Sequence, residues 1–199
     1  MTLQAIVFIA SYLFGSIPTA LMVARLAGRP DPRTVGTGNA GSTNVALTVG
    51  PAAGVAVLCI DLLKGIVAAL FGLRLGGQLT GDLCAVAAVA GQIAPIFAGF
   101  RGGKGAATTL GGYFGLSPML AVLGLASWVM GLLSIHRFVV ATVTAILALT
   151  AVTLVLHEHV VFGMGAAVLT LYAHRRDLAA WRRGEMPTIR QALRDNRRR

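Results

Sequence analysis

Long apolar runs recur along this chain and alternate with short polar segments. Seven runs are recognisable, near residues 3–26, 51–73, 81–98, 105–116, 119–135, 138–156 and 158–173. Most are close to the roughly 17 to 25 residues that an α-helix needs to cross the hydrocarbon core of a bilayer. The fourth is shorter, because about twelve residues at a rise of 1.5 Å each reach only roughly 18 Å. The pattern predicts an all-α, polytopic membrane helical bundle of about seven spans, in which the fourth span is short.

Composition excludes an ordinary soluble domain. Of the 199 residues, 56% are hydrophobic and only 12% are charged, whereas an average soluble domain carries about 25% charged residues. The residues before the first apolar run include no basic residue, and Gly15 and Pro18 lie inside that run. A cleaved signal peptide begins with a basic region, so we expect the first run to remain as a span.

The net charge of +10 is concentrated at one end of the sequence. Nine of the seventeen basic residues lie in segment 175–199, after the last apolar run. A basic tail on a membrane protein marks the cytoplasmic side and can bind anionic lipid headgroups. Membrane lipids are therefore the expected partners of the tail, nucleic-acid binding is the weaker interpretation, and we expect no nucleic-acid partner.

Basic residues also predict the orientation, because they are retained on the cytoplasmic side of short loops. With seven spans and the N-terminus outside, the tail and nearly all loop cations are cytoplasmic, and only Arg74 falls outside. Merging residues 105–135 into one span would move either the tail or five loop cations outside. The topology predicts a cytoplasmic C-terminus and places three polar segments, 31–44, 101–109 and 174–185, on the cytoplasmic face.

The first polar segment contains Gly36-x-Gly38-x-x-Gly41, which formally matches a dinucleotide-binding fingerprint. The match is spurious, because the fingerprint needs a preceding strand in a βαβ unit and a membrane helix precedes this segment. Its glycines still allow close backbone approach, its N–H groups can form an anion-binding nest, and Arg33 can add a bidentate contact. The segment indicates an anion site, and the alternative is a flexible polar connector.

The second polar segment resembles a phosphate-binding P-loop without being one. Ala98 and Gly105 stand where the P-loop requires a glycine and a hydroxyl. A glycine-rich loop with Lys104 at a helix N-terminus is nevertheless suited to phosphate, because free N–H groups and the helix dipole favour an oxyanion. The alternative is that Arg101 and Lys104 only mark topology.

Two further pairs of ionisable residues have helical spacing. His174 and Asp177 share a face if the last helix continues, and the alternative for this histidine is an interfacial or capping role. Asp61 and Lys64 lie inside the second run, either as a structural ion pair or as part of a site.

We predict no metal site. His157-Glu158-His159 falls on the opposite face from the polar segments, and Cys59 and Cys84 have no metal-ligand spacing. The pattern Gly111-x-x-x-Gly115 predicts close helix packing.

Taken together, these segments resemble the acyl-phosphate:glycerol-3-phosphate acyltransferases of bacterial membranes over nearly the whole chain. The matching motifs are Gly36–Asn44 with Arg33 upstream, Asp61–Gly65, Gly102–Thr108, and the set His174, Asp177, Gly184 and Glu185. The sequence departs from the family pattern at Thr37, where serine is usual, at Gln92, where we expect histidine, and at Asp177, where asparagine is usual. Residues 138–141 also lack serines that relatives tend to carry. A carboxylate at 177 would repel a phosphate dianion unless it is paired.

The resemblance implies transfer of a fatty acyl group from acyl phosphate to glycerol 3-phosphate, giving lysophosphatidic acid and phosphate for phospholipid biosynthesis, without a cofactor or metal. Residues 1–174 would form a single transmembrane catalytic domain in the bacterial cytoplasmic (inner) membrane, and 175–199 a basic cytoplasmic tail. The soluble enzyme that supplies acyl phosphate is a further candidate partner. The implied catalytic residues are Arg33, Thr37, Asn39, Lys104, His174 and Asp177. The implied substrate-binding residues are Gly38, Gly41, Ser42, Thr43, Asn44, Lys64, Gly102, Gly103, Gly105, Thr108 and Glu185.

The sequence also limits the mechanism. No histidine is followed five positions later by an aspartate, so the His-x-x-x-x-Asp pair of another acyltransferase class is absent. We hypothesise that Lys104 and nearby N–H groups hold glycerol 3-phosphate, while Arg33, Thr37, Asn39 and His174 hold the acyl phosphate. Two alternatives stay open, a transporter of a phosphorylated metabolite and a catalytically silent paralogue.

Overall fold

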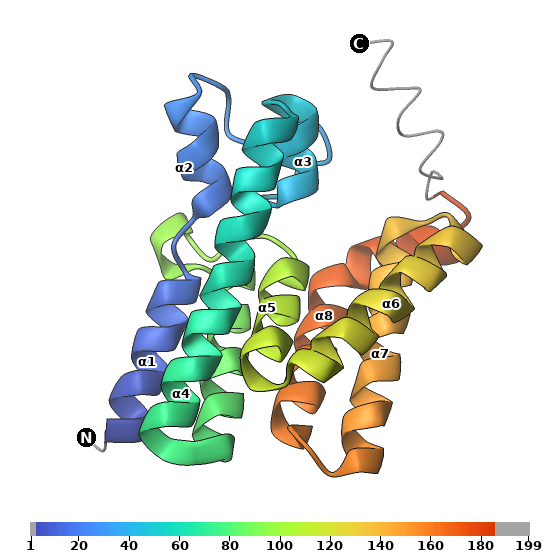
Figure 1. Ribbon diagram of the computed structural model, residues 1–199. Helices are drawn as coiled ribbons and strands as arrows, with labels where there is room; N and C mark the ends of the chain where they lie inside the picture. The colour runs from blue at the N-terminus through green and yellow to red at the C-terminus, as the bar shows by residue number, and fades with distance from the viewer. Residues whose placement is uncertain (1–2, 186–199) are drawn as a thin grey trace.

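The computed structural model describes residues 3–185, and the regular secondary structure within them is all helical (Figure 1), which confirms the all-α prediction. The elements are α1 Leu3–Gly15, α2 Thr19–Leu26, α3 Ser42–Thr48, α4 Pro51–Ile93, the 3-10 helix η1 Ile96–Ala98, α5 Ala106–Leu116, α6 Pro118–Ile135, α7 Phe138–Leu156 and α8 Val160–Arg182. Four stretches are long and apolar enough to cross a membrane: Leu3–Leu26, Pro51–Ala98, Pro118–Ile135 and Phe138–Leu156. Most of the predicted tail lies outside the described residues.

Helix α4 is two helices that meet at a glycine pair. Gly76 and Gly77 have non-helical backbone angles, and Gly77 has a φ of +73° that only glycine adopts without strain. The chain doubles back there, at the lower end of the bundle in Figure 1. A Cβ on Gly72 would lie 2.6 Å from the carbonyl oxygen of Thr80, so the two arms touch beside the turn. The break separates the second and third apolar runs, as predicted.

The first apolar run is not one continuous helix. It divides into α1 and α2, with Ser16, Ile17 and Pro18 between them. Proline has no N–H to donate and its ring crowds the preceding turn, which ends α1. The third run also ends earlier than predicted, at Ile93, and η1 follows it. Both interruptions lie next to the glycine-rich loops.

Glycines allow the backbones of neighbouring helices to pack in direct contact. A Cβ on Gly65 would collide with the carbonyl oxygen of Thr108, and one on Gly111 with that of Leu62. A Cβ on Gly115 would lie 2.7 Å from that of Ala69. The first arm of α4 therefore lies directly against α5, and the prediction that Gly111 and Gly115 serve close packing is confirmed.

The outer surface of the bundle is apolar. Large hydrophobic side chains are exposed around the helices, with Phe71 at 59%, Met130 at 69% and Val155 at 76% of full exposure. Water does not tolerate apolar exposure on this scale, whereas a bilayer does. The bundle is therefore a multi-pass membrane domain. In Figure 1 the described chain begins at the lower end. The loop after α2 lies at the top of the picture, the loop before α5 lies below it at the upper end of α5, and the last turn of α8 lies at the upper end of that helix.

Candidate active site

The structure brings the three polar segments together at the upper end of the bundle. Arg33 of the first segment donates from Nη1 to the carbonyl oxygens of Ala98 at 2.9 Å and Arg101 at 3.3 Å. Lys104 of the second segment forms an ion pair of 2.7 Å with Asp177 of the third. Segments far apart in the sequence thus form one polar site over the bundle.

The first loop is folded around the side chain of Asn44. This buried amide donates from Nδ2 to the carbonyl oxygens of Pro32, Val35 and Asn39 at 2.6, 3.1 and 3.0 Å. Its Oδ1 accepts the N–H of Thr37 at 2.8 Å. Both halves of the amide are committed to the loop backbone, so Asn44 shapes the loop from within instead of offering an amide to a substrate.

Arg33 joins the first loop to the second. Besides its bonds to carbonyls of the second loop, its guanidinium binds Asp31 through Nε and Nη2, the shortest distance being 2.7 Å. The Arg33 hydrogen bonds hold the pKa of the Asp31 carboxyl below its ordinary value, and Asp31 raises the pKa of Arg33. Arg33 is therefore engaged before any substrate arrives.

The second loop is anchored by its own backbone at the end of α4. Gly102 and Gly103 donate their N–H groups to the carbonyl oxygens of Ile93 at 3.1 Å and Gln92 at 3.0 Å. A Cβ on Gly103 would lie 2.8 Å from the carbonyl oxygen of Ala40, so the two loops touch at this glycine. A side chain at position 103 would force one of the two loops to shift.

Lys104 precedes the N-terminus of α5, as predicted. Gly105 caps the helix with a φ of +76° that favours glycine. The first bond of the helix runs from the N–H of Thr109 to the carbonyl oxygen of Gly105, so the N–H groups of residues 106–108 precede it. A charged amine next to these N–H groups and the positive end of the helix dipole attracts a phosphate.

Helix α8 supplies the third part of the site. It continues to Arg182, so His174 and Asp177 share one face, as the sequence predicted. The His174 ring is 2% exposed, and its Nδ1 lies 3.0 Å from the carbonyl oxygen of Thr170. A carbonyl only accepts, so Nδ1 donates this hydrogen bond and Nε2 remains for another partner. Lys104 provides the pairing that a carboxylate at 177 needs beside a phosphate.

Lys64 does not fit the substrate-binding role given to it above. Its amine is buried and donates to the Ile17 carbonyl oxygen, to Asp61 Oδ1 and to Gln92 Oε1. An ammonium has three donors, so none remains for a ligand. The alternative of a structural ion pair describes Lys64 and Asp61 better.

The remaining predicted residues are distributed around this site. Thr37, Gly38 and Thr43 are exposed, and Asn39, Gly41, Ser42 and Gly102 are half-buried. Thr108 is fully buried with an unpartnered hydroxyl. Glu185 follows α8 and pairs with Arg183 at 2.9 Å; within the described residues it forms no ion pair with either loop.

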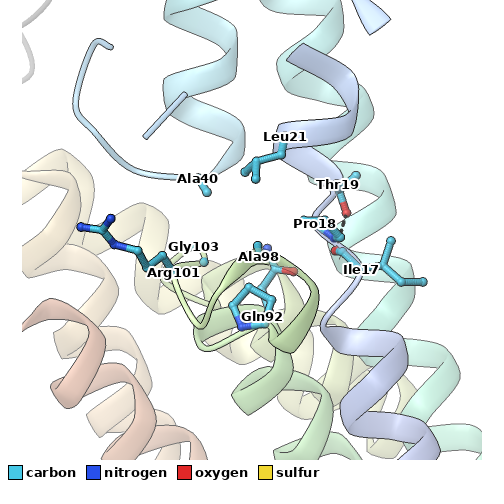
Figure 2. Close-up of a pocket in the computed structure, with 11 residues that line it drawn as sticks. Ile17, Pro18, Thr19, Leu21, Ala40, Gln92, Ala98, Arg101 and Gly103 are labelled. Carbon is cyan, nitrogen blue, oxygen red and sulfur yellow. Dashed lines mark hydrogen bonds between the residues drawn. The ribbon is translucent and has the colours of Figure 1, made fainter. Parts of the chain in front are cut away.

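A small pocket lies between the α1–α2 break and the two loops (Figure 2). Its lining includes Ile17, Pro18 and Thr19 from the break, Ala40 from the first loop, and Gln92 and Gly103. Sequence reasoning missed the contribution of the break, although a proline inside an apolar run was the signal for it.

A larger groove shares Pro18 and Leu21 with this pocket. It has a volume of about 410 Å³ and is also lined by Met22, Phe97, Arg25, Arg29 and Asp31. The guanidinium groups of Arg25 and Arg29 have no hydrogen-bond partner within residues 3–185. The groove therefore combines an apolar wall with two unpaired positive charges.

Comparison with known proteins identifies the chain's relatives. The sequence model of the family described as Glycerol-3-phosphate acyltransferase matches residues 5–184. The glycerol-3-phosphate acyltransferase of Thioalkalivibrio sulfidiphilus (strain HL-EbGR7) is 38% identical, over 95% of each chain. That of Thiobacillus denitrificans (strain ATCC 25259 / T1) is 39% identical, over 88% of this chain and 92% of its own.

Solved structures agree with the sequence relatives. The crystal structure of PlsY (YgiH), an integral membrane glycerol 3-phosphate acyltransferase, in its glycerol 3-phosphate form superposes with a TM-score of 0.88. It is 32% identical, over 94% of this chain and 95% of that chain. Its lysophosphatidic acid form gives a TM-score of 0.86 at 31% identity. Because the family model matches this chain along almost its whole length, the chain belongs to the glycerol-3-phosphate acyltransferase family of integral membrane enzymes.

Proposed function

We propose that this chain transfers a fatty acyl group from acyl phosphate to glycerol 3-phosphate, giving lysophosphatidic acid and inorganic phosphate. The observation that carries the proposal is Lys104, which lies in the second glycine loop at the N-terminus of α5 and is paired with Asp177 at 2.7 Å. The resemblance stated from the sequence and the family membership of the chain support the same reaction.

The chemistry requires no side-chain nucleophile. The primary hydroxyl oxygen of glycerol 3-phosphate attacks the acyl carbon, and the bond from that carbon to the phosphate oxygen breaks. The departing phosphate takes the hydroxyl proton, so atoms and charge balance. Catalysis then rests on holding two anionic substrates together and on neutralising their charge.

Each part of the site has a role in this proposal. Lys104, with the N–H groups at the start of α5, binds the phosphate of glycerol 3-phosphate and releases Asp177 in exchange. Thr37, Asn39 and His174 hold the acyl phosphate, whose oxygens accept hydrogen bonds, and the histidine contributes by donating from a protonated Nε2. Arg33 contributes by fixing the first loop against the second through its bonds to Ala98 and Arg101.

The groove beside Pro18 suits the acyl donor. An acyl phosphate is an apolar chain with an anionic head, and the groove offers Met22 and Phe97 with Arg25 and Arg29. Met22→Trp is expected to fill the groove and raise the KM for long-chain acyl phosphate while the KM for glycerol 3-phosphate stays unchanged. Equal changes in both constants would assign the acyl chain to another surface.

The orientation remains part of the proposal. We propose seven spans, with the N-terminus outside and the site on the cytoplasmic face of the inner membrane, because the basic loop residues then lie inside. Cys59 and Cys84 are first replaced by alanine, and single cysteines are placed at the exposed neighbours Gln78 and Arg183. In intact cells, an impermeant maleimide should label only the cysteine at 78. Labelling at 183 alone would reverse the topology.

Turnover by purified protein tests the reaction itself. Protein supplied with acyl phosphate and glycerol 3-phosphate should release lysophosphatidic acid and phosphate in equal amounts. Lys104→Ala should abolish turnover while the thermal unfolding midpoint is kept, and Arg74→Ala, which removes a cation elsewhere, should stay active. Near-normal activity of Lys104→Ala would refute its assignment. Flux of labelled glycerol 3-phosphate into sealed vesicles without product would instead favour a transporter.

A further inference from the structure

We propose that the buried cluster of Asp61, Lys64 and Gln92 is a positioning device for the second glycine loop, and that it sets the affinity of the site for the phosphate of glycerol 3-phosphate. The inference rests on the proposed function. It concerns residues that do not touch substrate and act through the backbone of Gly102 and Gly103.

The three side chains form a closed ring of hydrogen bonds. Lys64 Nζ donates to Asp61 Oδ1 at 2.9 Å and to Gln92 Oε1 at 2.8 Å. Gln92 Nε2 donates to Asp61 Oδ2 at 2.8 Å. Each partner is at most 7% exposed. The ring joins the two arms of α4 to each other, because Asp61 and Lys64 lie on the first arm and Gln92 on the second.

Gln92 connects this ring to the second loop. Its carbonyl oxygen accepts the N–H of Gly103 at 3.0 Å, one residue before Lys104. A Cβ on Gly103 would lie 3.3 Å from Gln92 Nε2, so the amide also packs against the loop. Any movement of Gln92 is therefore transmitted to the backbone that presents Lys104.

The third bond of Lys64 reaches the other wall of the pocket. Its Nζ lies 2.6 Å from the carbonyl oxygen of Ile17, in the break between α1 and α2. Ile17 and Gln92 both line the pocket beside Gly103, and Figure 2 shows Gln92 between the break and the loop. One buried ammonium thus ties together the arms of α4 and the break that walls the pocket.

A purely structural explanation accounts poorly for this arrangement. Burying an ion pair costs free energy that apolar packing does not, and ionisable residues inside membrane segments usually mark function. The chain also provides a buried pair for comparison, since Asp82 Oδ1 lies 2.7 Å from His159 Nδ1 near the start of α8. Asp82 lies on the second arm of α4, as Gln92 does, but within residues 3–185 the pair forms no hydrogen bond or ion pair with either glycine loop.

The amide at position 92 has the chemistry that the ring needs. It must donate one hydrogen bond to a carboxylate and accept one from an ammonium. Glutamine does both with its two ends, and neutral histidine does both with its two ring nitrogens. The departure from histidine at this position therefore preserves the ring, whereas methionine would keep the volume and lose both bonds.

The experiment measures the KM for glycerol 3-phosphate, kcat and thermal unfolding in the full-length protein. Gln92→Met should raise this KM about tenfold or more and change kcat less. Gln92→His should stay within about twofold of the original protein. Asp61→Asn and Asp82→Asn form a matched pair of buried carboxylates: the first should raise the KM, and the second should lower only the unfolding temperature.

Two kinetic results would overturn the inference. One is an unchanged KM for glycerol 3-phosphate in Gln92→Met. The other is a rise of this KM in Asp82→Asn that equals the rise in Asp61→Asn when the two variants lose the same thermal stability. Trypsin cleavage after Arg101 and Lys104 gives a readout that needs no turnover, and it should be faster in Gln92→Met than in Asp82→Asn. An original protein that shows no acyl transfer would refute the proposed function, whereas unchanged cleavage in Gln92→Met would refute this inference.

Discussion

Replacing Asp177 by asparagine changes the charge of the site and almost nothing else. The carboxylate forms an ion pair of 2.7 Å with Lys104. Asparagine has the same shape and keeps a hydrogen-bonding oxygen, so the helix and the loops are expected to stay in place. The substitution frees the amine for phosphate and removes a negative charge that repels the incoming dianion.

The exposure of the pair sets the size of the effect. The two side chains are 27% and 30% exposed, so the pair is screened by water and is worth about 1 kcal/mol or less. Because 1.4 kcal/mol corresponds to a factor of ten, a gain of about 1 kcal/mol lowers the KM for glycerol 3-phosphate about fivefold. The gain should shrink as ionic strength rises, since salt screens exposed charges.

The assay is initial-rate kinetics with varied glycerol 3-phosphate at saturating acyl phosphate, at low and high salt. Asp177→Asn should lower the KM and leave kcat within about twofold. Glu158→Gln, which removes an exposed carboxylate at the other end of α8, should change neither constant. A higher KM, or a kcat reduced more than about tenfold, would show that the carboxylate has been recruited into catalysis.

Three further predictions concern the loops. Asn44→Ala should lower the free energy of unfolding by about 1 to 3 kcal/mol in denaturant titration, because backbone groups of the first loop lose their hydrogen-bond partners. An unchanged free energy would show that other contacts stabilise this loop. Gly103→Ala should raise the KM for glycerol 3-phosphate because its Cβ would lie 2.8 Å from the Ala40 carbonyl oxygen, and Gly131→Ala, with ordinary contacts at 3.5 Å, is its control. The Asp31 carboxyl has a pKa below its ordinary 3.8, so the stability from its Arg33 pair is present above that value and is lost as the pH falls through the lower pKa. Carboxyl NMR titration should show this pKa, and Arg33→Gln should return it toward the ordinary value; no return would assign the shift to another group.

Local pattern was enough to predict the long apolar helices and the polar loops, but not the break between α1 and α2 or the short α3. The length of an apolar run, the proline at its start and the glycines between runs are local properties, so the short α5 and the doubling back of α4 were readable from them. The glycine-lysine pattern also predicted that Lys104 precedes the start of a helix, because the residues that end a loop and begin a helix are neighbours in the sequence.

Pairings between distant segments were not readable. The sequence left Lys64 open as a substrate ligand, because nothing near it shows that Gln92 and the carbonyl oxygen of Ile17 occupy its donors. Asn44 was assigned to substrate for the same reason, although its amide holds the loop. In both cases a polar side chain in a suggestive motif turned out to satisfy backbone groups that the fold had left without partners.

The contribution of α8 to the site has a consequence for how the protein is made. Lys104 and both glycine loops emerge early from the ribosome, whereas His174 and Asp177 belong to the last helix. A nascent chain therefore carries a cationic half-site and gains the facing half only when the final helix has inserted and packed. The proposed site is therefore completed only after α8 has been inserted. A chain arrested before α8 would lie in the membrane without a complete site.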